Sequence, residues 1–117
     1  MGDHDLSRTV FDVQGTLHRL GGDEDLLSDM IGIFLDDMPK LLAALQEAVE
    51  AQDAESAKKS AHALHGLFLG CGGIRAGRAA QEVEQAASKD LASLPTRAAN
   101  LKKEIELLVE AICSYRT

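Results

Sequence analysis

His62 stands where an imidazole could react with a partner molecule. If residues 54–71 form a helix, with successive residues about 100° apart around its axis, His62 lies about 140° from the centre of the apolar stripe. That position is on the solvent side. A neutral imidazole is a nucleophile, and this form is abundant near neutral pH. The spacing therefore predicts a histidine nucleophile, while a surface histidine without a reaction would show the same pattern.

Two glycines follow His62 on the same side of this predicted helix. Gly66 comes one turn later and Gly70 a further turn later. A glycine inside a helix costs about 1 kcal/mol relative to alanine, so a pair of them needs a reason. We interpret them as clearance for a bulky partner, with the exposed, apolar Leu69 beside them as part of a docking surface. The other interpretation is that they merely lie near a helix end.

Amphipathic helices must position these residues. Apolar side chains recur every three or four residues, and no alternating β-branched run competes with that period. The predicted helices cover residues 12–20, 23–49, 54–71, 76–87, and a last one from Ser93 or Pro95 to Tyr115. Pro39 should kink or split the second of these near Met38. We expect an all-α fold, an antiparallel four-helix bundle with the short first helix as a lid.

Composition narrows the class of protein further. The chain has 117 residues, 45% of them apolar, and a net charge of −7, which argues against nucleic-acid binding. We expect one domain over residues 10–117 after a flexible segment, residues 1–9. No apolar run is long enough for a membrane span, and two cysteines are too few for a disulfide scaffold. A monomeric cytosolic protein without a membrane or nucleic-acid partner is the expectation.

The segment Ala61-His62-Ala63-Leu64-His65-Gly66, with Gly72 beyond it, resembles the motif of the histidine phosphotransfer (HPt) family. That motif reads His-x-Leu-Lys-Gly, with a further glycine ten positions after the histidine. The resemblance extends over about residues 10–88. The other matching segments are Phe11-Asp12, Leu20-Gly21-Gly22-Asp23, Phe34-Leu35-Asp36-Asp37-Met38-Pro39, Asp53, and the helix positions Ala76, Ala80 and Val83.

The resemblance implies a relay without a nucleotide site or a cofactor of its own. His62 would accept a phosphoryl group from the aspartate of a response-regulator receiver domain, or from a sensor histidine kinase, and pass it to another receiver. The receiver would bring the Mg²⁺. His65 and Lys59, each one turn from His62, would lie near the phosphate, and Lys58 is more simply read as a solvated charge. His65 replaces the family lysine, so its charge depends on protonation.

Two rival functions share these residues. In the first, a degenerate member of the family binds a receiver or a kinase without transferring phosphate, which the change to His65 makes a real alternative. In the second, the bundle binds a metal through His62 and His65. Carboxylate-bridged metal sites in bundles need a glutamate three residues before each histidine, and Lys59 and His62 stand there instead.

The remaining metal-ligating side chains predict no site. A Gly2-Asp3-His4 start could bind copper after removal of Met1, but any chain end can show it by chance. His18 reads as a surface residue, and the acidic runs 23–25 and 36–37 read as helix-start and solvated charges. Cys71 and Cys113 are both predicted to be reduced packing residues.

Overall fold

A computed structural model describes residues 8–116 of the chain. Its helices are α1 (Val13–Arg19), α2 (Glu24–Glu50), α3 (Ala54–Cys71), α4 (Ile74–Lys89), the 3-10 turn η2 (Leu91–Ser93) and α5 (Leu94–Arg116). No strand occurs between residues 8 and 116, which confirms the all-α prediction. Within the same range, none of the helices combines the length and the apolarity that crossing a membrane requires. The Gly2-Asp3-His4 segment lies outside the described residues.

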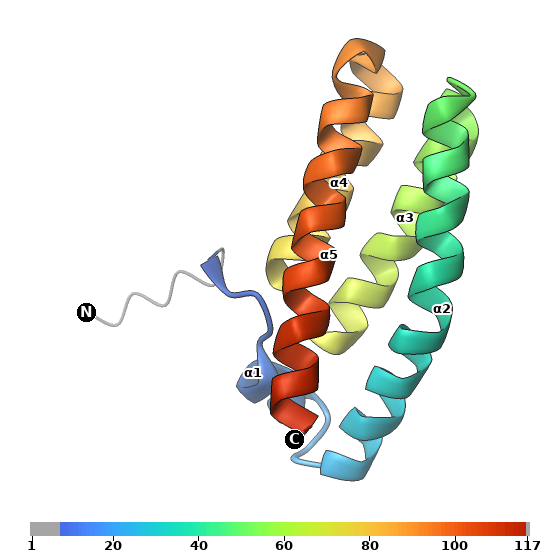
Figure 1. Cartoon of the computed structure of the whole chain (residues 1–117). Coiled ribbons are helices and arrows are strands. Elements are labelled where there is room, and N and C mark those ends of the chain that lie inside the picture. Colours follow the sequence, from blue (N-terminus) through green and yellow to red (C-terminus); the bar gives the residue numbers. More distant parts are fainter. Residues whose placement is uncertain (1–7, 117) are drawn as a thin grey trace.

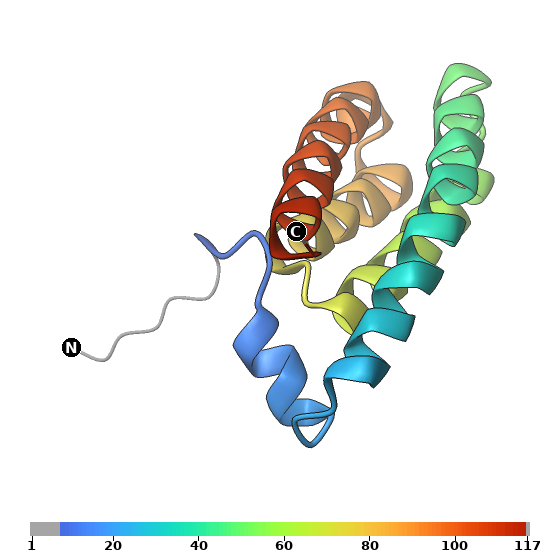
Figure 2. The same cartoon turned by 60° about the horizontal axis from the view of Figure 1, so that its bottom comes forward.

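Four long helices form the body of the molecule. α2, α3, α4 and α5 run up and down in turn, each antiparallel to the one before it (Figure 1). α3 packs extensively against α2 on one side and against α4 on the other, and α5 packs mainly against α4. The short α1 lies across one end of the bundle, next to the α3–α4 connection, as Figure 2 shows. This is the predicted four-helix bundle with a short first helix at its end.

Three helices begin at aspartates that the sequence marks as caps. The carboxylates of Asp12, Asp23 and Asp53 each accept a hydrogen bond from the backbone N–H three residues later, at 2.9, 3.0 and 3.2 Å. Each bond satisfies one of the N–H groups that a helix start leaves without an internal partner. The predicted starts of α1, α2 and α3 are therefore confirmed.

The core is aliphatic, with two phenylalanines at its centre. The rings of Phe34 and Phe68 lie 5.8 Å apart between α2 and α3. α4 presents small residues, and Gly77 and Ala80 are buried on its inner side, so that its backbone comes close to α3. The predicted inner stripe of α3 is confirmed, because all of its members are buried: Ala57, Ala61, Leu64, Phe68 and Cys71. Burial raises the pKa of the Cys71 thiol to about 11, which keeps it protonated.

The structure corrects three expectations. The predicted split of α2 near Met38 is wrong: the helix continues through Pro39, since the buried side chains of Phe34, Met38 and Leu45 anchor it on both sides of the missing backbone donor. Cys113 is exposed instead of buried, because it follows the buried residue of its turn and so points outward. Tyr115 is in phase with the inner stripe of α5 but remains 43% exposed, beyond the end of the core.

Candidate functional site on α3 and α4

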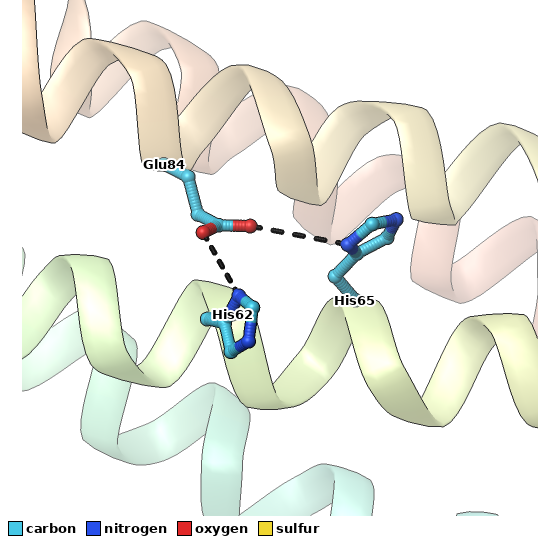
Figure 3. Close-up of polar contacts among 3 residues, drawn as sticks. All are labelled: His62, His65 and Glu84. Carbon is cyan, nitrogen blue, oxygen red and sulfur yellow. Dashed lines mark hydrogen bonds and ion pairs between the residues drawn. The ribbon is translucent and has the colours of Figure 1, made fainter.

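His62 projects from the middle of α3 into solvent. Its side chain is 76% exposed, and its Nδ1 lies 3.1 Å from Oε2 of Glu84 on α4. Figure 3 shows the imidazole beside the carboxylate with its second nitrogen turned away from it. The ring is therefore held at one nitrogen and open at the other.

The hydrogen bond to Glu84 selects the form of the imidazole. An ionised carboxylate only accepts hydrogen bonds, so the nitrogen that faces it must carry a proton. In the neutral ring, the lone pair then resides on Nε2 of His62. The arrangement presents this lone pair to the solvent, where an incoming electrophile would meet it.

His65 lies on the same side of α3 but closer to α4. Its side chain is 19% exposed, and its Nδ1 is 3.9 Å from Oε1 of Glu84. A Cβ on Gly77 would lie 3.7 Å from Cδ2 of His65, an ordinary contact distance, so the imidazole packs directly against α4 here. The two histidines thus share one carboxylate, as Figure 3 shows.

Glu84 is the member of this site that the sequence analysis missed. It follows the buried Val83 and has no special neighbours along the chain. A signal did exist in the connection between the helices. Because Gly72 and Gly73 join α3 to an antiparallel α4, residues about equally far from this connection lie opposite each other. Counting away from it in both directions pairs His62 with Glu84.

The residues after His62 differ in how freely a partner can approach them. A Cβ on Gly66 would meet nothing within 4 Å, whereas one on Gly70 would lie 3.4 Å from the Cε of Met30 on α2. The space beside Gly66 is therefore open, whereas a side chain at Gly70 would contact the flexible end of Met30 on α2. Leu69 is 62% exposed, and Ile33 across the groove between the two helices is 56% exposed. Together they give the surface beside Gly66 an apolar character.

Lys59 is exposed one turn before His62. It lines a depression between α2 and α3 together with Asp53 and Ser56, on the opposite flank of α3 from Glu84. Among the described residues, no hydrogen bond or ion pair joins Lys59 to His62. The structure therefore brings His62, His65 and Glu84 together and leaves Lys59 apart.

No group of three or more His, Cys, Asp and Glu side chains between residues 8 and 116 is arranged to hold a metal ion. His62 and His65 both face the carboxylate of Glu84, but these three side chains do not converge on one point as metal ligands do. What the site offers is an exposed imidazole nitrogen with a carboxylate behind it.

Comparison with known proteins agrees with this architecture. A sequence model of the Hpt domain matches residues 29–114. The chain is also similar to the crystal structure of the HPT domain from the Hpt sensor hybrid histidine kinase of Shewanella, with a TM-score of 0.78 and 23% identity. That match covers 95% of each chain. A comparison with curated protein sequences gives no match.

Proposed function

The chain belongs to the Hpt domain family, and on this premise we propose that it carries phosphoryl groups between signalling proteins on His62. Its partners are response-regulator receiver domains, a hybrid sensor histidine kinase, or both. The observation that carries the proposal is the exposed Nε2 of His62, oriented by the bond from Nδ1 to Glu84. The exposure of His62 and its hydrogen bond to Glu84 together support the choice of this histidine.

The reaction is a nucleophilic substitution at phosphorus. The lone pair on Nε2 of His62 forms an N–P bond while the bond from phosphorus to the receiver's aspartate oxygen breaks, and the electron pair of that bond returns to the carboxylate. Phosphorylation makes the ring cationic, with its proton still on Nδ1. Glu84 stabilises that charge through the same hydrogen bond. The receiver supplies Mg²⁺ for the transferred phosphoryl group.

Transfer to a second receiver is the reverse of this step with another aspartate. The phosphoryl group leaves Nε2, and the ring returns to its neutral form with the proton on the nitrogen that faces Glu84. No proton needs to move between the two nitrogens in either direction. The carboxylate therefore suits a carrier that must both accept and release the group.

The decisive experiment uses a panel of purified receiver domains that have been phosphorylated with acetyl phosphate. We expect the chain to take up acid-labile, alkali-stable label from at least one receiver, and the His62→Gln variant to take up none. His65→Ala is the matched control, because it removes a neighbouring imidazole and should retain the label. Label that survives in His62→Gln would show that another residue reacts.

A second variant tests the role of the carboxylate. Glu84→Gln keeps the size of the side chain and removes its charge, so the cationic phosphohistidine loses its counter-charge. We expect transfer to His62 to slow about tenfold, which corresponds to about 1.4 kcal/mol. Unchanged rates in Glu84→Gln would contradict this role.

The wild-type chain also tests the alternative function. Measurable binding of a receiver with no label on the wild-type chain would favour an adaptor that binds without transfer.

A further inference from the structure

A cationic pocket lies next to the histidine pair, on the side of His65 that leads toward the α3–α4 connection. It has a volume of 220 Å³ and contains the side chains of Arg19, His65, Arg78 and Gln81. Its remaining lining is apolar or glycine: Phe68, Leu69, Gly72, Gly73, Ile74 and Gly77. No carboxylate of residues 8–116 lines the pocket, although the whole chain has 19 acidic and 12 basic residues. The local charge is thus opposite in sign to that of the chain.

The two arginines of this pocket differ from others in the same bundle. Arg75 and Arg97 are paired with Glu104 and Glu82, at 2.8 and 3.2 Å. Neither Arg19 nor Arg78 lies within ion-pair distance of a carboxylate on any described residue. A guanidinium offers five N–H donors in a planar fork that matches a carboxylate. Two such groups in one hollow leave many donors for an external acceptor.

Arg19 is also held in place before any partner arrives. One nitrogen of its guanidinium donates to the backbone oxygen of Leu69 at 3.1 Å and lies 3.4 Å from the hydroxyl of Thr16. These contacts tie the side chain from α1 across to the end of α3. Fixing a long side chain beforehand lowers the entropy cost of binding. The remaining donors of Arg19 stay available.

We propose that this pocket binds an acidic side chain of the receiver domain that docks on His62, and so helps to select the receiver. The proposal rests on the proposed function, because it needs a receiver at His62. His65 links the two places, since it lines the pocket and also faces the carboxylate that holds His62. Leu69 supplies apolar area at the rim of the pocket. An acidic partner meets repulsion over most of a chain with a charge of −7, so a cationic hollow beside the reactive group directs it there.

The test measures how tightly one receiver domain binds. That receiver is the one that gives the strongest transfer in the panel or, if none transfers, the one that binds most tightly. The variants are Arg78→Ala, Arg78→Glu and Arg19→Ala, each compared with Lys102→Ala, which removes a cation on α5 away from the pocket. Arg78 makes no ion pair among the described residues, so its variants should fold as the wild type does. A thermal melt checks Arg19→Ala, which also loses the bond to Leu69.

We expect Arg78→Ala to weaken receiver binding about tenfold, and Arg78→Glu to weaken it more. Lys102→Ala should bind nearly as the wild type does. Raising the salt concentration should weaken the wild type more than Arg78→Ala, because the variant has lost a charge contact. In transfer assays, Arg78→Ala should raise the receiver concentration needed for half-maximal transfer, as weaker docking requires.

Other results would overturn the proposal. If Arg78→Glu binds the receiver as tightly as Lys102→Ala does, the pocket does not take an acidic group. Binding by the wild type without any transfer would refute the proposed function alone, because the arginine variants would still report on the pocket through binding. If no receiver in the panel binds the wild-type chain, both proposals fail together.

Discussion

Gly66 and Gly72 lie on the same helix or at its end, yet their surroundings are opposite. A Cβ on Gly66 would point into open space, whereas one on Gly72 would collide with the Thr16 hydroxyl and lie 2.8 Å from the backbone oxygen of Asp12. The φ angle of Gly72 is +85°, in the left-handed region that side chains disfavour. The fold therefore requires glycine at Gly72 and gives no reason for it at Gly66. A residue that the fold does not explain, next to an exposed histidine, points to a partner.

The strongest test of this contrast is Gly72→Ala. The new methyl group would combine an unfavourable φ with a backbone contact that no rotamer change relieves. We expect the free energy of unfolding to fall by about 2–4 kcal/mol, measured by chemical denaturation. α1 should loosen as well, because the Asp12 N–H donates to the Gly72 oxygen at 2.8 Å. A loss below about 0.5 kcal/mol would show that the α3–α4 connection tolerates a side chain.

Gly66→Ala should have the reverse pattern. Without a steric conflict, alanine should raise the free energy of unfolding by about 0.5–1 kcal/mol. Transfer from a receiver should nevertheless slow, since the methyl group occupies space that the docked partner needs. Quenched time courses of phosphoryl transfer at a series of receiver concentrations would separate weaker docking from a slower reaction.

Gly32 provides the matched control for that variant. It also lies inside a helix, α2, and a Cβ there would meet nothing within 4 Å. Gly32→Ala should therefore stabilise the chain by a similar amount and leave transfer unchanged. Equal transfer rates in the Gly66→Ala and Gly32→Ala variants would remove the argument that Gly66 provides clearance.

Much of this architecture could be predicted, because it depends on neighbours along the chain. Aspartate caps act on the backbone three residues later, as Asp53 does, and the buried stripe of α3 follows from helix period alone. The exposure of His62 follows from the same period. Pro39 shows where local reasoning fails, since packing from other helices holds α2 together despite the lost hydrogen bond.

The partners of His62 depend on tertiary structure and were less accessible to prediction. Glu84 is 22 residues away, and only the antiparallel register of α3 and α4 brings it within 3.1 Å. The pocket of Arg19 and Arg78 is formed where α1, α3 and α4 meet, so predicting it requires the relative positions of all three helices. His65 could be predicted to lie nearer the core than His62, but its contact with a shared carboxylate could not. Residues that act across helices are thus the ones that sequence period does not reveal.

The beginning of α3 provides the smallest test, and it contrasts with the sterically demanding end at Gly72. The hydroxyl and the backbone N–H of Ser56 both donate to Asp53, and these bonds lower the pKa of its carboxyl below 3.8. The unfolded chain therefore takes up this proton at a higher pH than the folded chain does. The stabilisation from Asp53 is complete above pH of about 4 and is lost as the pH falls through the lowered pKa of the folded state. Asp53→Ser keeps a capping side chain without a titrating group, so unfolding measured from pH 6 to 2.5 should show a shallower acid decline for the variant. Parallel curves would mean that the cap at the start of α3 acts through geometry alone, as Gly72 does at its end.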